Sequence, residues 1–181
     1  LPPDNIVGSV VYPACEIIKP GTIKHIAGNR FSLGEPEGSE SDRLKFISEI
    51  LKKAGFRAPI QKNIRDEIWL KLIGNLSFNP ISALTGATLE QICNDQGTEA
   101  IVRAMMTEAK IIAEELGAKI NMSIEKRIEG ARKVGAHKTS MLQDIEAGKP
   151  IEIDSIIIAV KELGELTCSP TPYIDTILNL T

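Results

Sequence analysis

The spacing of hydrophobic residues changes once along the chain. Up to about residue 34 the pattern is β-branched or alternating, as in VGSVVYPACEII and TIKHIAG, with a turn at Pro20-Gly21 between them. From Ser41 onward, hydrophobic residues recur every three or four positions, which is the period of an α-helix. We therefore predict short strands over residues 6–34, a further short strand at 57–60, and helices elsewhere from residue 41 to the C-terminus.

Capping residues and glycines divide the helical part into segments. The predicted helix starts are Asp95, Ser123, Ser140, Glu152 and Pro172. The predicted stops are Gly55, Gly117, Gly135 and Gly148. The hydrophobic face predicted for the helix after Asp95 consists of Ile101, Met105, Ala109, Ile112 and Leu116.

The stretch IRDEIWLKLIGNLSFNPISA, residues 64–83, is hydrophobic nearly all round but carries one polar seam. Lys71, Asn75 and Asn79 recur at i, i+4 and i+8, so they lie on one face of a helix. A buried lysine costs several kcal/mol unless it is paired or faces a polar cavity. The seam therefore predicts a ligand or an internal partner. We expect Pro80 to kink or end this helix, because a proline ring clashes with the carbonyl four residues earlier.

A second candidate region is HKTSMLQDIEAGKPIEIDSI, residues 137–156. Ser140 lies beside Thr139 at a predicted helix start, where hydroxyls and free backbone N–H groups favour an anion such as a carboxylate. Glu152 opens the next predicted helix. Both residues also have structural explanations, since serine is a common helix cap and an acidic residue complements a helix dipole.

The seam likewise has a structural explanation. Lys71 could reach the surface along its own methylene groups, and the two amides could hydrogen-bond between packed helices. Under that interpretation the chain is a helical interaction module without chemistry, which is a hypothesis of a different class from an enzyme.

The two parts of the chain predict two domains. Residues 1–62, with three or four short strands and one helix, hardly make a self-sufficient sheet, because its edges and one face would need cover. We expect them to be the last strands and helix of a dinucleotide-binding domain, and residues 63–181 to be all-helical. The chain opens LPPDN without Met, which indicates part of a longer protein. No two of the 14 glycines are two residues apart, so any GxGxxG fingerprint is expected upstream of Leu1.

Composition excludes several other classes of protein. A net charge of −3 gives no basic surface for nucleic acid, and no run approaches the roughly 18 apolar residues of a membrane span. Three widely spaced cysteines without a CxxC motif favour a reducing compartment, so we expect a cytoplasmic protein. With two histidines in addition, we expect no metal site.

Three pieces of the sequence together resemble ketopantoate reductase (2-dehydropantoate 2-reductase). They are RFSLGEPEG after the predicted strands, EIWLKLIGNLSFNPISALTG, and TSMLQDIEAGKPIEID. The first is similar to the end of that family's cofactor domain, the second to its catalytic helix and the third to its substrate-binding segment. The resemblance implies a mainly α fold, with a helical domain like that of 6-phosphogluconate dehydrogenase after a β-rich remnant of a Rossmann domain.

The resemblance also implies an activity and a role for each candidate residue. The family reduces ketopantoate to pantoate, on the route to pantothenate and coenzyme A, with NADPH bound by the N-terminal Rossmann half. Lys71 matches the catalytic lysine that protonates the carbonyl oxygen, and Glu152 matches the acid that pairs with the lysine and the substrate. Asn75 and Asn79 match pocket amides, and Ser140 matches the serine that binds the substrate carboxylate. Glu152 is in addition a candidate contact to the cofactor.

Some features leave alternatives open. Where some members carry a further polar residue after the catalytic helix, this chain reads ALTGATLEQ, so another 2-keto acid remains an alternative substrate. A β-hydroxyacid or opine-type dehydrogenase on the same architecture is a related alternative. The sequence does not distinguish NADPH from NADH. We expect the chain to be inactive without the missing Rossmann half, and to form homodimers through exposed apolar helices.

Overall fold

The computed structural model describes residue 2 and residues 5–181. The chain divides into two compact units, Leu1–Ile68 and Trp69–Thr181, which we call the strand unit and the helical unit. The division falls within one helix, α2 (Ile64–Thr85). Each unit is described by itself.

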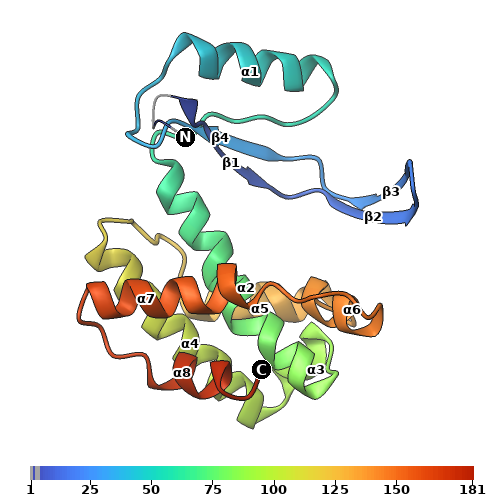
Figure 1. The fold of residues 1–181 in the computed structure, drawn as a ribbon, viewed down its shortest axis with the longest axis vertical. Helices are drawn as coiled ribbons and strands as arrows, with labels where there is room; N and C mark the ends of the chain where they lie inside the picture. Colours follow the sequence, from blue (N-terminus) through green and yellow to red (C-terminus); the bar gives the residue numbers. More distant parts are fainter. Residues whose placement is uncertain (1, 3–4) are drawn as a thin grey trace. The chain divides into compact units, whose positions relative to one another are not determined.

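The strands predicted over residues 6–34 are present in the strand unit, where they form two antiparallel pairs (Figure 1). β1 (Gly8–Val11) pairs with β4 (Phe31–Gly34), and β2 (Ala14–Lys19) pairs with β3 (Thr22–Ala27). The turn between β2 and β3 is at Pro20-Gly21, where Gly21 has a φ of 76° that glycine adopts at no steric cost. The β-branched run VGSVVYPACEII forms parts of two strands, separated at Tyr12-Pro13, because proline has no N–H to donate to a ladder.

Helix α1 (Asp42–Lys53) lies on one side of β1 and β4 (Figure 1). Ser41 caps its start by accepting from the Leu44 N–H, and Leu44 packs into a small core with Leu33 and Ala58. The segment at 57–61 runs parallel beside β4, where the Phe31 N–H donates to the Arg57 carbonyl at 2.8 Å. The strand expected at 57–60 is therefore present as an extended segment with isolated bridges.

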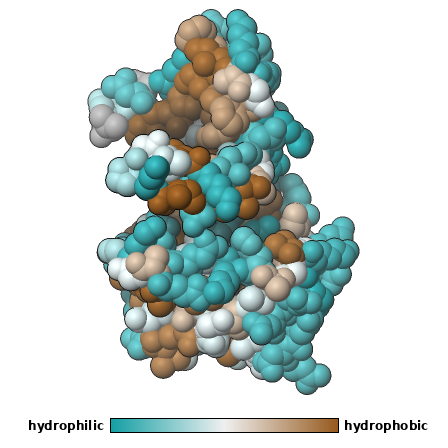
Figure 2. All heavy atoms as spheres, turned by 90° about the vertical axis from the view of Figure 1, so that its right-hand side faces the viewer, coloured by the Kyte–Doolittle hydropathy of each residue, from teal (hydrophilic) through white to brown (hydrophobic). Residues whose placement is uncertain are grey.

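Hydrophobic side chains also gather at the surface of the strand unit (Figure 2). On the β2–β3 hairpin, Ile17 and Ile23 face each other across the strands and are 70% and 69% exposed. A two-stranded hairpin buries little hydrophobic surface, so the shape of this one depends on the hydrogen bonds between its strands and on its turn.

The helical unit confirms the predicted mainly α fold. Its elements after α2 are α3 (Leu89–Asn94), α4 (Gln96–Glu115), α5 (Ile124–Val134), α6 (Ser140–Glu146), the π-helical turn η2 (Asp154–Ile158), α7 (Ala159–Leu166) and α8 (Pro172–Leu178). The four predicted glycine stops are confirmed, since each follows a helix with φ between 66° and 90°. The largest fully buried side chains of this unit are Leu76, Ile92, Met105, Met106, Ile112, Ile128, Ile157 and Ile174.

Two expectations about the helices are wrong in detail, and one helix was not expected. Pro80 does not end α2, which continues to Thr85, because the flanking residues Phe78 and Ile81 are buried in the core and hold the turn. Leu116 is 43% exposed and does not belong to the buried face of α4, whereas Val102 and Met106, which were not predicted, do. Helix α3, which was not expected, begins with a capping box.

Candidate functional site

The polar seam lies on α2 within the helical unit. Lys71 and Asn75 are partly buried, and Asn79 is 6% exposed. Around them, Ile73, Leu76 and Phe78 are in the hydrophobic core. The three polar side chains therefore follow one another along a helix that the fold largely surrounds with apolar groups.

Two opposing influences act on the Lys71 ammonium. Burial lowers the pKa of Lys71 from its ordinary value, because it removes water from the charged form, and the Glu152 carboxylate opposes this by favouring that form. Glu152 is exposed and lies in the segment just before η2. The structure thus brings these two predicted residues into electrostatic range although they lie 81 positions apart in the sequence. An ammonium with a lowered pKa is a better proton donor than a solvated lysine.

Ser140 is the first residue of α6 and is exposed. The cap of this helix is Thr139, whose hydroxyl accepts from the Leu142 N–H at 3.3 Å. The capping explanation of Ser140 is therefore wrong. Thr139 caps α6, so capping does not explain why residue 140 carries a hydroxyl group.

The loop before Ser140 is tied to the start of α3. The Leu89 N–H donates to the His137 carbonyl at 3.0 Å, and the Glu90 N–H donates to the Gly135 carbonyl at 3.3 Å. The same loop is also tied to α6, where the side-chain amide of Gln143 donates to the Lys138 carbonyl at 2.9 Å. The Leu89 and Glu90 bonds use backbone N–H groups that the first turn of a helix leaves without intrahelical partners.

Sequence reasoning missed a close contact on α2 next to the seam. Gly74 faces Arg127 of α5 so closely that a Cβ there would overlap guanidinium Nη2 and lie 2.9 Å from both Cζ and Nε. A glycine inside a long apolar helix costs about 1 kcal/mol relative to alanine. That cost was the signal in the sequence, and the guanidinium is its explanation.

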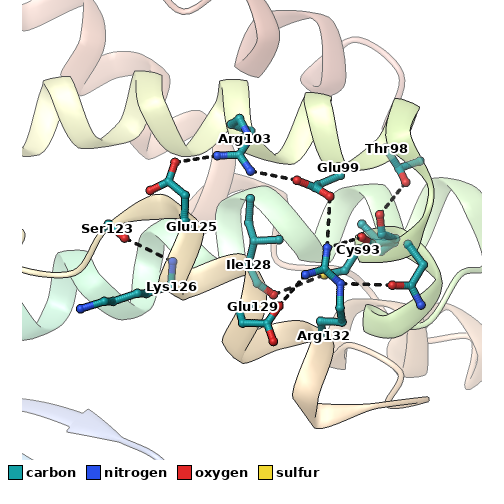
Figure 3. Close-up of polar contacts among 12 residues, drawn as sticks. Cys93, Thr98, Glu99, Arg103, Ser123, Glu125, Lys126, Ile128, Glu129 and Arg132 are labelled. Atoms are coloured by element: carbon teal, nitrogen blue, oxygen red, sulfur yellow. Dashed lines mark hydrogen bonds and ion pairs between the residues drawn. The ribbon is translucent and has the colours of Figure 1, made fainter.

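A network of ion pairs joins two helices of this unit, α4 and α5 (Figure 3). Glu99 of α4 bridges two arginines, with Arg103 at 2.8 Å on one oxygen and Arg132 of α5 at 3.2 Å on the other. Glu125 and Glu129 complete it, at 2.8 Å from Arg103 and 2.6 Å from Arg132. Local patterns did not reveal it, because Glu99 and Arg132 lie 33 residues apart in the sequence.

Over residues 2 and 5–181, no three His, Cys, Asp or Glu side chains are arranged to hold a metal ion. In the same part of the chain, none of the helices has both the length and the hydrophobicity to cross a membrane.

Comparison with known proteins gives a consistent result. Residues 63–181 match the family described as "Ketopantoate reductase PanE/ApbA C terminal". A 2-dehydropantoate 2-reductase of Mesorhizobium japonicum (strain LMG 29417 / CECT 9101 / MAFF 303099) is 56% identical over 178 residues, which are 98% of this chain and 55% of the relative. The chain therefore spans about half the length of the curated relatives it matches.

Solved structures agree on the fold. A crystal structure from Ralstonia solanacearum MolK2, assigned to ketopantoate reductase, has 43% identity and a TM-score of 0.94, covering 99% of this chain and 55% of that one. A D-mandelate dehydrogenase in complex with NADH has 21% identity and a TM-score of 0.88, covering 99% of this chain and 62% of that one, a likeness that concerns the fold alone. On the family match and these relatives, the chain belongs to the ketopantoate reductase family, and residues 63–181 are the part that corresponds to the family's C-terminal region.

Proposed function

We propose that this chain carries the substrate-binding and proton-donating part of an NADPH-dependent 2-dehydropantoate 2-reductase. The observation that carries the proposal is the Lys71 ammonium on an apolar helix, with burial and Glu152 acting on its pKa in opposite directions. Membership of the family and the 56% identical 2-dehydropantoate 2-reductase support the choice of reaction.

The proposed chemistry is hydride addition to the 2-keto carbon with proton transfer to its oxygen. The bound nicotinamide cofactor supplies the hydride. Lys71 stabilises the negative charge that develops on the carbonyl oxygen and gives it a proton, so that the product is the 2-hydroxy acid and the lysine is left neutral until water reprotonates it. Glu152 favours the charged form of Lys71 before each turnover.

The remaining predicted residues are proposed to bind the substrate. The Asn75 and Asn79 amides can each donate to one oxygen and accept from a hydroxyl, which suits a hydroxy-keto acid. We assign the substrate carboxylate to Ser140, whose hydroxyl is not taken up by capping α6.

The sequence has no GxGxxG loop to hold a pyrophosphate, so we expect no turnover by this chain alone. Activity is therefore to be measured on a fusion protein, in which this chain follows the part of the Mesorhizobium relative that it does not cover. The assay follows NADPH oxidation with ketopantoate, and NADH in place of NADPH tests the choice of cofactor.

Replacing Lys71 tests the mechanism. In the fusion protein, Lys71→Ala should lower kcat about 10²–10⁴-fold, the usual loss when a general acid is removed. Lys110→Ala is the matched control, because Lys110 is also partly buried in the helical unit but pairs with Glu114 at 3.6 Å. A Lys71→Ala protein with near-normal kcat would show that the proton donor has been assigned incorrectly.

A second candidate is reduction of another 2-keto acid. The observation that favours it is the shared fold of the D-mandelate dehydrogenase, since one fold serves several substrates. A panel of 2-keto acids separates the two candidates. Strong preference for the branched hydroxy-keto acid supports ketopantoate, whereas equal or better turnover of an aromatic 2-keto acid would favour the alternative.

A further inference from the structure

The guanidinium of Arg132 joins three helices of the helical unit, α3, α4 and α5, and has no part in the proposed mechanism (Figure 3). It donates to the Cys93 carbonyl at 2.7 Å and to the Asn94 side chain at 3.1 Å, both at the end of α3. It also pairs with Glu99 of α4 and with Glu129 of its own helix. A planar guanidinium with a fixed fork of donors can hold four such acceptors at once, which an ammonium cannot do with the same geometry.

Helix α3 is thus held at both ends by the chain segment that leads to Ser140. At its end, Arg132 near the end of α5 binds the Cys93 carbonyl. At its start, the Leu89 and Glu90 N–H groups bind the loop carbonyls of His137 and Gly135. Because α3 is only six residues long, displacing one end moves the other.

We propose that Arg132 is a positioning residue, which fixes α3 and through it the loop that places Ser140 for the substrate carboxylate. The assignment rests on the proposed function. It adds a residue that touches neither substrate nor cofactor, and whose removal acts on substrate binding more than on the chemical step.

Arg103 provides a matched control. Like Arg132, it pairs with Glu99, and it also pairs with Glu125, so its removal breaks ion pairs of the same network. Its contacts run to α4 and to the first turn of α5 rather than to α3. A general loss of network stability would therefore affect both arginine variants, whereas the proposed positioning affects one.

The first test is kinetic and uses the fusion protein with ketopantoate. Arg132→Met should raise KM about 5- to 50-fold with little change in kcat, since small misplacement of a binding group costs up to about 100-fold. Arg103→Met should leave KM close to its parent value, and Arg132→Lys should give a smaller rise than Arg132→Met. In a Ser140→Ala background, Arg132→Met should add no further rise, because the group it positions is already absent.

The second test needs no turnover and uses the 181-residue chain itself. Amide hydrogen exchange at Leu89 and Glu90 should be faster in Arg132→Met and Arg132→Lys than in the parent and in Arg103→Met. Unchanged exchange in the Arg132 variants, a fall in kcat without a rise in KM, or an equal rise in KM in the Ser140→Ala background would each overturn the proposal. A parent fusion protein that reduces no 2-keto acid would overturn the proposed function and the role of Arg132 in it, even with faster exchange at α3.

Discussion

The charge state of a single residue, Lys71, depends on two influences with opposite signs. Burial lowers its pKa and Glu152 raises it. The proposed proton donor must be charged, so kcat/KM should fall as the pH rises through the lowered pKa of Lys71. In Glu152→Gln the carboxylate's contribution is lost, so this fall should begin at a lower pH than in the parent.

The measurement is a pH profile of kcat/KM for both fusion proteins. Glu146→Gln is a suitable control, because Glu146 pairs with Lys138 at 2.6 Å and has no assigned part in the chemistry. If kcat/KM falls at the same pH in the parent and in Glu152→Gln, the Glu152 carboxylate does not raise the pKa of Lys71.

Gly74 is a second position where one residue decides the outcome. Gly74→Ala adds a methyl group that overlaps the Arg127 guanidinium, which is the end of a flexible side chain and can move aside at low cost. This displacement offsets part of the gain of about 1 kcal/mol in helix propensity, so we expect Gly74→Ala to raise the free energy of unfolding by less than that gain.

Gly130→Ala is the control for that prediction. Gly130 is also inside a helix, α5, but a Cβ there meets no atom within 4 Å. Gly130→Ala should therefore raise the free energy of unfolding by up to about 1 kcal/mol. Both free energies can be obtained from urea unfolding followed by Trp69 fluorescence, and a Gly74→Ala protein stabilised as much as Gly130→Ala would contradict the close contact.

At the scale of elements, α8 is capped by a residue from another helix. Thr171 gives it no side-chain cap, and Glu108 of α4 instead accepts from the Tyr173 and Ile174 N–H groups at 2.9 and 3.0 Å. Glu108→Ala leaves these donors without an acceptor, so we expect a loss of about 1–3 kcal/mol in the free energy of unfolding. Glu108→Gln, which keeps one acceptor oxygen, should lose less.

Burial raises the pKa of Glu108 above its ordinary value of 4.5, and this outweighs the two hydrogen bonds. The folded state therefore holds the proton more tightly than the unfolded state, and this residue's contribution to stability increases as the pH falls through the raised pKa. Urea unfolding at several pH values measures both the loss of stability in Glu108→Ala and the change of Glu108's contribution with pH. Glu115→Ala, at the exposed end of the same helix, should change stability by less than about 0.5 kcal/mol.

The Glu108 cap marks the limit of what the sequence could predict about the elements. Gly55 and Gly117 were predictable as stops because a helix end depends on neighbouring residues and glycine adopts positive φ. The predicted end of the helix at Pro80 is wrong, because burial of the residues around it overrides a local penalty. Glu108 lies 65 positions from Tyr173, so its role follows only from tertiary packing.

The candidate site shows the same division. The Lys71–Asn75–Asn79 seam was visible because helix periodicity places these residues on one face. The influence of Glu152 on Lys71 came from the family resemblance and not from any local pattern. Arg132 was invisible, since its acceptors at Cys93 and Glu99 lie on other helices.

At the scale of the whole molecule, the two units should respond differently to acid. In the strand unit, Arg43 donates to both oxygens of Glu35 at 2.8 and 2.6 Å, and Ser41 also donates to this carboxylate. The Arg43 and Ser41 hydrogen bonds hold the pKa of Glu35 at about 2, below its ordinary value of 4.5. The folded state therefore binds the proton more weakly, so the stabilisation is fully present above about pH 4.5 and is lost as the pH falls toward 2.

Glu35→Gln should therefore be less stable than the parent near neutral pH, with the difference shrinking as the pH falls from 4.5 to 2. Urea unfolding is to be followed by the methyl NMR signals of Leu33 and Leu44, which report on the core of the strand unit. Trp69 fluorescence reports on the helical unit in the same samples. By this probe, the difference in stability between the parent and Glu35→Gln should not shrink as the pH falls. Glu37→Gln is the matched control, because Glu37 is close in sequence but accepts from the exposed Ser39 hydroxyl. A parent and a Glu35→Gln protein that lose stability in parallel on acidification would show that the Glu35–Arg43 pair does not control the acid response of the strand unit.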